Sequence, residues 1–512
     1  MPHNLKDLVV VLALALAVFH FARPIATRFM DAADFSRRRN VWLALTTLAF
    51  LSPSFWLFVL LAIPTLIWAR RRDRNPAALY LLLLHVIPPL PIAIPVVGIN
   101  QLFDLDNYRL LAFCILVPVA LQLRRDKHAT PLAGFQAADA VLLAFGALYV
   151  MFYIPPDLPN HLILADSPTN MLRRVVLFMV DVYVLYFVMS RACSSKERLV
   201  DAMAAFCLGC AVMALVAVFE SARHWLLYAD IQINWTGSYE RLYLERFGLL
   251  RAQAGAGHSL ALGFLLAIAF GFWLYLRRHV DSRRARIAVT LLLWLGLIAA
   301  YSRGPWFGAV AIYLAFMAVG PGTFGRVVKA AMLVAALLAG ISWSPFGERI
   351  VKVLPFMGGR VDQANVAYRQ RLAARSWQLF LQHPFFGDRL AYSQMQDLRQ
   401  GQGIIDLVNT YAELAVFRGF VGLFLFASFA LLPVFAAYRA LRAALAADPD
   451  RARLGASLIA CMLGTLLMLF DASLVLGYEK MFYVLAGLAT AYAHMRVDEL
   501  NSRHAPVSAA GY

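Results

Sequence analysis

The chain has 512 residues, of which 61% are hydrophobic and only 15% are charged, and its mean hydropathy is +0.66. A soluble domain is about 25% charged, so this composition excludes an ordinary soluble enzyme and indicates a protein folded in a lipid bilayer. The formal net charge is +17. The basic residues lie in short clusters between apolar runs and form no separate domain, which argues against nucleic-acid binding.

The apolar runs are long and continuous, so they predict transmembrane helices and not the short alternating strands of a barrel. We therefore predict an all-α, polytopic membrane helix bundle with about 12–15 transmembrane helices. The first run is expected to be a retained span, because no small-residue cleavage site follows it. The expected spans are 5–22, 41–51, 55–69, 77–97, 110–123, 138–154, 172–190, 199–219, 258–276, 287–301, 305–320, 328–342, 413–437, 453–471 and 479–495.

The clusters of basic residues predict the orientation, because cytoplasmic loops are enriched in Lys and Arg. Placing every cluster in the cytoplasm requires 41–69 to be a helical hairpin, and puts the N-terminus in the periplasm and the C-terminus in the cytoplasm. The expected location is the bacterial inner membrane. The clusters are Arg37 to Arg39, Arg70 to Arg74, Arg124 to Lys127, Arg191 to Arg198, Arg277 to Arg286, Arg326 with Lys329, and Arg439 to Arg453.

Two loops on the opposite, periplasmic side are long, at 220–257 and 343–412. Long polar loops on one side of a membrane protein commonly carry binding or catalysis. The second loop is expected to contain a helix from Ala364 to Gln382. Around these loops we divide the chain into N-terminal transmembrane helices 1–198, a catalytic-like core 199–437, C-terminal transmembrane helices 438–495 and a cytoplasmic tail 496–512.

Five cysteines occur, and Cys207 and Cys210 form a CxxC pair. In a soluble protein this spacing suggests redox or zinc chemistry. Here the pair lies in an apolar run without a nearby His or carboxylate, so we interpret both as packing residues and expect no metal and no cofactor. The long periplasmic loops contain no Cys, so no structural disulfide is expected.

The first candidate site is the short turn Ser302-Arg303-Gly304-Pro305 between two predicted spans. Pro favours the start of a helix, and a helix start presents free N–H groups. An arginine beside such a start is suited to binding phosphate. The alternative is an interfacial arginine whose long stem reaches the headgroups. We expect Arg303 to be catalytic.

The second candidate site is Arg251 to Ser259, a glycine-containing approach to a predicted span. Backbone amides freed by Gly255 and Gly257 are suited to an anion, with Arg251 as its counter-charge. We expect Arg251 to be catalytic and His258 to bind substrate. The alternative for His258 is a structural role at the helix end.

The third candidate site lies in the predicted loop helix, where Arg371 and Arg375 are four residues apart and share a face. Like charges at this spacing repel each other unless an anion lies between them, so both are expected to bind substrate. The alternative is a solvated helix face.

The fourth candidate site is Asp406 to Glu413, which enters a predicted span. Asp406 and Glu413 are expected to be catalytic, and Asn409 and Tyr411 to bind substrate. A carboxylate at the edge of a membrane needs a partner, so the alternative for Glu413 is a structural ion pair with Arg303 or Arg418.

These four segments, in this order, resemble the O-antigen ligase and O-antigen polymerase superfamily over roughly residues 200–437. The matching pieces are the Arg- and Gly-containing helix start, the Ser-Arg-Gly between two spans, the Arg-rich loop helix followed by His-Pro-hydrophobic-Gly, and the Asn-x-Tyr-x-Glu before a helix with Gly-x-x-Gly. They are Arg251 to His258, Ser302 to Gly304, Arg371 to Gly387, and Asn409 to Gly422.

The resemblance implies a membrane glycosyltransferase that uses a glycan on polyprenyl diphosphate at the periplasmic face, for O-antigen or exopolysaccharide. Its partners would be that lipid-linked glycan, the bilayer and other polysaccharide-export proteins. Ligases carry a His immediately before the Asn, and here that position is Val408. The sequence therefore favours a polymerase of repeat units over a ligase that transfers glycan to lipid A-core or protein. A membrane transporter is the alternative of another class.

Overall fold

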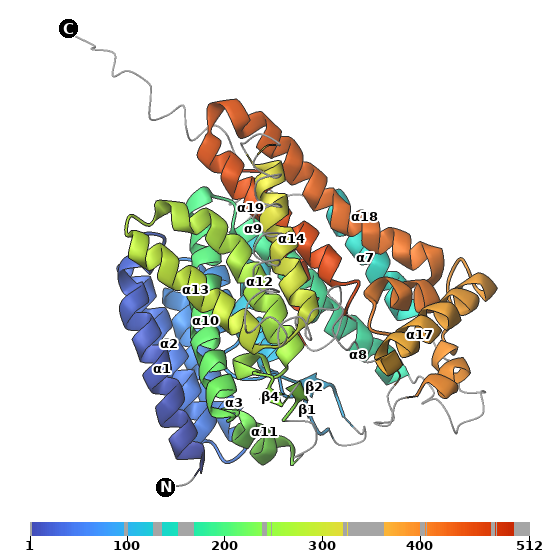
Figure 1. The fold of residues 1–512 in the computed structure, drawn as a ribbon, viewed down its shortest axis with the longest axis horizontal. Coiled ribbons are helices and arrows are strands. Elements are labelled where there is room, and N and C mark those ends of the chain that lie inside the picture. Colours follow the sequence, from blue (N-terminus) through green and yellow to red (C-terminus); the bar gives the residue numbers. More distant parts are fainter. Residues whose placement is uncertain are drawn as a thin grey trace.

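The chain is described here from a computed structural model, for residues 3–96, 101–125, 136–151, 168–237, 243–246, 248–320, 325, 363–399, 405, 407–472, 477 and 479–495. The described part is predominantly helical, and the helices pack side by side into a bundle (Figure 1). The predicted all-α, polytopic membrane fold is confirmed. The predicted span 328–342 and the tail 496–512 lie outside the described residues.

The first helices follow the predicted spans closely, with one exception. The short segments 41–51 and 55–69 lie in two packed helices, so the predicted hairpin around Ser52-Pro53-Ser54 is confirmed. Ser54 begins the second of these helices by accepting a hydrogen bond from the Leu57 amide. The helices are α1 (His3–Ala26), α2 (Ala32–Leu51), α3 (Phe55–Arg72) and α4 (Pro76–Leu83).

The prediction of one helical span over 77–97 is wrong. Helix α4 ends at Leu83, and the chain then runs through Pro88, Pro89 and Pro91. Proline has no amide hydrogen and clashes with the preceding turn, so it cannot continue a helix. The chain instead forms the short strand β1 (Ile92–Ala93), which pairs antiparallel with β2 (Asp104–Leu105).

Two further predicted spans are continuous helices that each contain one π-helical turn. The first consists of α5 (Asn107–Leu111), η1 (Ala112–Leu116) and α6 (Val117–Arg125). The second consists of α8 (Pro168–Phe178), η2 (Met179–Tyr183) and α9 (Val184–Ala192), and α7 (Ala137–Met151) lies between the two along the chain. Asp181, in the second π-turn, pairs with Arg109 at 2.8 Å and with Lys480 at 3.3 Å. This half-buried charge is therefore neutralised within the bundle, although the sequence did not indicate its partners.

The middle of the chain forms the centre of the bundle. Helix α12 is buried along almost its whole length, between α10, α13, α14 and α19. All five cysteines are buried and free, and the Sγ of Cys207 lies 3.4 Å from the Ala269 carbonyl of α12, so the predicted packing role of the CxxC pair is confirmed. The elements are α10 (Lys196–Arg223), α11 (Ala229–Thr236), β3 (Glu245–Arg246), β4 (Leu249–Leu250), η3 (Ala254–Ala256), α12 (Ser259–Leu276), η4 (Arg277–His279), α13 (Arg283–Ala299) and α14 (Arg303–Val319).

The C-terminal part contains the longest helix and the predicted loop helix. Helix α17 (Gln363–Gln382) matches the predicted helix from Ala364 to Gln382, and η5 (Ala391–Leu398) packs on it. Helix α18 (Thr410–Ala447) runs past α17 and turns into α19 (Pro449–Met468), which is followed by α20 (Glu479–Ala493) (Figure 1).

Seven of the described helical segments are long and apolar enough to cross a membrane. Two shorter apolar helices, Ala137–Val150 and Arg303–Val319, add to them. The total of 12–15 spans stays a prediction. The seven segments are Asn4–Ala26, Asn107–Arg125, Asn170–Ala192, Lys196–Arg223, Ser259–His279, Thr410–Ala447 and Pro449–Met468.

Several basic clusters that were predicted to be cytoplasmic meet at one end of the bundle. Lys196 and His279, from two different clusters, both pair with Asp450, at 2.9 and 3.1 Å. Arg28 pairs with Asp281 at 2.6 Å near the same turn. The helices α11 and α17 lie toward the opposite end (Figure 1). This arrangement agrees with the charge asymmetry, and the identity of the cytoplasmic side stays a prediction.

Candidate functional site

The turn between α13 and α14 carries Arg303 at the first position of α14. Tyr301 adopts a left-handed backbone (φ 44), and Ser302 is extended and only 3% exposed. The prediction of an arginine at a helix start is confirmed. We expected Pro305 to be the first residue of this helix, and it is the third. At this position Pro305 packs directly against Gly263 of α12, where an added Cβ would lie only 2.9 Å from the proline ring.

Arg251 reaches this turn from the glycine-containing segment. Its Nη2 donates a hydrogen bond to the Oγ of Ser302 at 2.8 Å. One residue further along, the Ala252 amide donates to the Ala299 carbonyl of α13 at 3.0 Å. The two segments that were singled out for their arginines therefore lie side by side, with Arg251 against the residue that precedes Arg303.

Arg303 is half-buried, and its Nε lies in the protein interior without a hydrogen-bond partner among the residues that the structure describes. Buried polar groups of folded proteins nearly always have a partner. The free N–H groups at the start of α14 point toward the same end of that helix. The arrangement can therefore accept an anion.

Asp471 is a site residue that sequence reasoning missed. It follows the C-terminal end of α19, and a Cβ on Gly304 would lie only 2.7 Å from its Oδ2. Its Oδ1 pairs with Nη1 of Arg369 on α17. Asp471 thus joins the Ser302-Arg303-Gly304 turn to the loop helix. Its one sequence signal is its place as the first charged residue after the apolar run 454–470.

The start of α18 lies beside Asp471. The Thr410 amide donates to the Leu469 carbonyl at 3.0 Å, and its Oγ1 donates to the Ala472 carbonyl at 2.7 Å. The neighbouring Asn409 caps the helix by accepting from the amides of Tyr411 and Ala412, at 2.9 and 3.1 Å. The hydroxyl of Tyr411 donates to the Leu466 carbonyl at 2.7 Å. These bonds fix Asn409 and Tyr411 at the site, and their predicted contact with substrate stays a prediction.

Of the two carboxylates predicted to be catalytic, Glu413 and Asp406, the structure describes only Glu413. Glu413 lies in the first turn of α18, five residues before the half-buried Arg418 of the same helix. Its ion pair with Arg303 or Arg418 stays a prediction. Asp406 lies outside the described residues. Val408, where ligases carry His, adopts a left-handed backbone (φ 50), which is unusual for a β-branched residue.

The predicted pair on the loop helix divides into two different environments. Arg371 is exposed. Arg375 donates to the Gln394 carbonyl from Nε and Nη2, at 3.2 and 2.9 Å, and so ties α17 to η5. The structure therefore gives Arg375 a structural bond that the sequence did not indicate. Arg369, which lies two residues before Arg371, reaches the Ser302-Arg303-Gly304 turn through Asp471.

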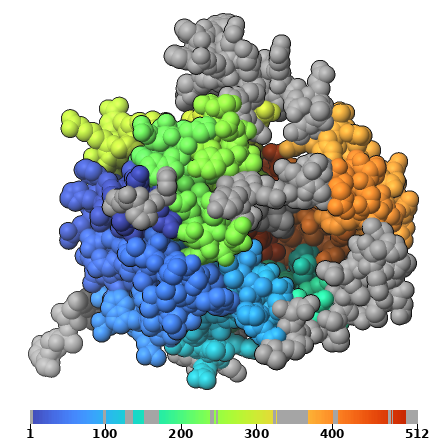
Figure 2. All heavy atoms as spheres, turned by 90° about the horizontal axis from the view of Figure 1, so that it is seen from below, coloured from blue at the N-terminus to red at the C-terminus, as the bar shows by residue number. Residues whose placement is uncertain are grey.

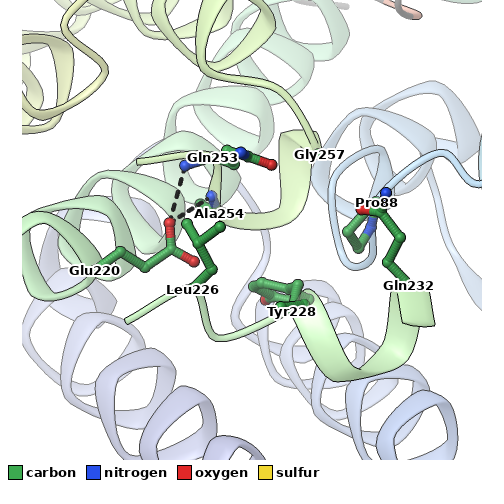
Figure 3. Close-up of a pocket in the computed structure, with 9 residues that line it drawn as sticks. Pro88, Glu220, Leu226, Tyr228, Gln232, Gln253, Ala254 and Gly257 are labelled. Carbon is green, nitrogen blue, oxygen red and sulfur yellow. Dashed lines mark hydrogen bonds between the residues drawn. The ribbon is translucent and has the colours of Figure 1, made fainter. Parts of the chain in front are cut away.

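The glycine-containing segment already holds an internal anion. The Oε2 of Glu220, from α10, accepts hydrogen bonds from the amides of Gln253 and Ala254, both at 2.9 Å (Figure 3). Its Oε1 accepts from the Leu227 amide at 3.1 Å. We expected amides of this segment to bind an external anion. Two of them instead bind the carboxylate of Glu220 within the protein. The two glycines provide close packing instead, since a Cβ on Gly255 would lie 2.1 Å from the His85 carbonyl.

A small pocket opens beside this carboxylate. Figure 3 shows Tyr228 and Gln232 below the segment, with Pro88 on the far side. Burial, with a contribution from the Glu220 carboxylate, raises the pKa of the Tyr228 phenol well above its ordinary value, so this phenol stays neutral. His258 caps α12, since its Nδ1 accepts from the Leu260 amide at 3.2 Å. The structural alternative for His258 is therefore found.

Seen from this end, residues of the C-terminal helices are visible between the green middle part of the chain and the orange α17 (Figure 2). Asp471, Gly304 and Arg369 join the elements on either side. Among the described residues, no group of three or more His, Cys, Asp or Glu side chains is arranged to hold a metal ion. The polar groups that converge here are arginines, carboxylates and helix-start amides.

Comparison with known proteins agrees with this geometry. Residues 288–427 match the family model described as O-antigen ligase. The match contains the Ser302-Arg303-Gly304 turn, the loop helix and the start of α18, while Arg251 and His258 precede it. No curated protein matches the chain. With its multi-pass helical fold and this matched region, the chain is similar to the O-antigen ligase and O-antigen polymerase superfamily.

Proposed function

We propose that the chain is a membrane glycosyltransferase that polymerises oligosaccharide repeat units carried on polyprenyl diphosphate, at the periplasmic face of the bacterial inner membrane. The observation that carries the proposal is the junction at the start of α14, where Arg251 bonds to Ser302, the residue immediately before Arg303. A diphosphate leaving group carries several oxygens, and guanidinium groups can grip them in pairs.

The reaction would proceed by direct displacement at the sugar. A hydroxyl of the incoming repeat unit attacks the anomeric carbon of the growing chain, a new C–O bond forms, and the C–O bond to the lipid diphosphate breaks. The hydroxyl proton passes to a base, and Glu413 and Asp406 are the proposed candidates. Arg251 and Arg303 stabilise the negative charge that develops on the leaving diphosphate.

Arg371, Arg375, Asn409, Tyr411 and His258 stay proposed substrate-binding residues. The structural bonds of Arg375, Asn409, Tyr411 and His258 favour positioning roles over direct contact for these four residues. Exposed Arg371 is the member of this set most available to a glycan.

A ligase that transfers glycan to lipid A-core or protein is the second candidate, and the description of the matching family favours it. Val408 argues for the polymerase, because ligases resemble this segment but carry His at that position. A valine can neither accept a proton nor hydrogen-bond to an acceptor sugar.

Deletion of the gene, followed by gel separation of surface and lipid-linked polysaccharide, distinguishes the two. The polymerase proposal predicts that single repeat units accumulate. Long polymer stranded on its lipid carrier would instead identify a ligase. An unchanged polysaccharide pattern would contradict both.

A further inference from the structure

The turn after α17 is joined to the first third of α18 by backbone hydrogen bonds. The Phe420 amide donates to the Pro384 carbonyl at 2.7 Å, and the Val421 amide donates to the Phe385 carbonyl at 3.1 Å. In return, the Asp388 amide donates to the Val416 carbonyl at 2.8 Å. In a regular helix these backbone groups of α18 would bond to other residues of the helix, and here they bond to the turn instead.

Two glycines make this joint possible. Gly387 (φ 71) and Gly419 (φ 60) both adopt the left-handed backbone that favours glycine. A Cβ on Gly387 would lie 2.5 Å from the Arg418 amide nitrogen, and a Cβ on Gly419 would lie 2.4 Å from the Phe385 carbonyl. The backbones of the turn and of α18 are in direct contact. This contact fixes the position of the turn along the axis of α18.

Helix α18 is apolar enough to cross the membrane, and one of its surfaces is open from the joint onward. Phe420 and Phe424 are 55% and 57% exposed, with ring centroids 6.0 Å apart, and Phe435 is 60% exposed further along. In a transmembrane helix such a surface faces lipid. Because the turn is bonded at Phe420 and Val421, it lies at the level where this lipid-facing surface begins.

The turn and the end of α17 continue the same apolar surface. Phe385 and Phe386 are 67% and 60% exposed, although they belong to a predicted periplasmic loop. Leu381 and Trp377 precede Phe385 at intervals of four residues on α17 and are also exposed. The opposite side of α17 is already buried, through Leu372 and Leu379, against η5 and Val416. An outer apolar stripe of this size is costly in water, whereas aromatic side chains are favoured at the membrane interface.

We propose that Trp377, Leu381, Phe385 and Phe386, with Phe420 and Phe424, form an interfacial anchor that inserts into the acyl chains of the leaflet on the α17 side of the bundle. The continuity with the lipid-facing surface of α18 identifies bilayer lipid as the occupant. The anchor would hold α17, and with it Arg369 against Asp471, at the level where a lipid-linked substrate presents its headgroup. This consequence rests on the proposed function, but the insertion itself does not.

Single-cysteine labelling of the full chain in phosphatidylcholine vesicles tests the insertion. The five native cysteines are buried, so a fluorescent maleimide label would report on one added site. The test site is Phe386→Cys, and the matched control is Asp397→Cys, an exposed residue of η5 on the other side of α17. We expect spin-labelled lipid to quench most of the fluorescence at 386 and iodide to leave it unchanged. At 397 we expect the reverse.

Quenching at 386 by iodide and not by lipid would place the surface in water and overturn the proposal. Protection from both quenchers would mean that a partner protein or a second copy covers it, which also overturns the proposal. A second reporter, Leu381→Cys, is measured with Phe385→Asp and Phe386→Asp introduced together. We expect these charges to abolish lipid quenching at 381, while Leu at both positions preserves it. Since both side chains are exposed, neither change disturbs the core, and the readout does not depend on enzymatic activity.

Discussion

Arg251 donates a hydrogen bond to the Oγ of Ser302, 2.8 Å away, and Ser302 is the residue immediately before Arg303. This one contact joins the two segments whose arginines had been singled out separately. Ser302 does not cap α14 with its side chain, as Ser usually does at this position, because its hydroxyl faces Arg251. Ser302 therefore bonds to a distant segment of the chain instead of capping its own helix.

Ser302→Ala should lower polymer yield about tenfold, since a hydrogen bond to a charged group contributes about 1.5–3 kcal/mol. The loss is expected because Arg251 would no longer be held beside Arg303. Polymer per membrane-inserted protein is the measurement. Ser282→Ala is the matched control, because Ser282 caps α13 at the opposite end of the bundle. Equal yields from the two variants would show that the Arg251 contact has no role in the reaction.

Asp471→Asn and Arg369→Gln should each reduce activity, and the double variant should lose little more than either alone. The reason is that both break the same joint between α17 and the Ser302-Arg303-Gly304 turn. A partly exposed ion pair contributes only about 0.2–1 kcal/mol to stability, so protein levels should stay normal. Arg28→Gln removes a comparable pair with Asp281 at the other end and should leave activity unchanged. Additive losses would argue that the two residues act separately.

Gly419→Ala should loosen the joint between the loop and α18. The substitution adds a left-handed backbone penalty of about 1–2 kcal/mol to a direct clash with Phe385. Limited trypsin cleavage within 363–399 should become much faster and activity should fall. Gly237→Ala is the matched control, because Gly237 has a similar φ of 68 but open space around it. If both variants resist trypsin equally, the close contact at Gly419 is not what holds the loop.

An impermeant maleimide should label Asp397→Cys from outside intact spheroplasts and should label Arg284→Cys only after lysis. The buried native cysteines keep the background low, and the two added sites lie at opposite ends of the bundle. The reverse pattern would invert the topology and move the candidate site to the cytoplasmic face.

The sequence predicted what depends on local signals. Hydropathy located the hairpin of α2 and α3, and the motif around Arg303 located a helix start between spans. It failed where local patterns conflict, as at 77–97, where apolar composition predicted a helix that the prolines interrupt. The lesson is that composition alone does not decide whether a buried segment is helical.

Partners distant along the chain were the second limit. Glu220 accepts hydrogen bonds from the amides of Gln253 and Ala254. Asp471 lies against Gly304 and pairs with Arg369. A single carboxylate in an apolar run gives no sign of which distant group it contacts. The interlocked glycines 387 and 419 were both part of quoted motifs, but their contact with each other's backbone required the fold.

Arg303→Lys tests the central proposal most directly, namely that the guanidinium at the start of α14 stabilises a diphosphate leaving group. Lysine keeps the charge but loses the paired hydrogen-bonding geometry. Loss of a positioned transition-state contact costs about 3 kcal/mol, or roughly a hundredfold in rate. Polymer yield is measured per protein in the membrane, with Arg284→Lys as the control at the opposite end. The proposal predicts that Arg303→Lys retains about one hundredth of the yield while Arg284→Lys retains all of it. A yield from Arg303→Lys near that of the unchanged protein would contradict the proposal, since an arginine that only reaches toward lipid headgroups can be replaced by lysine.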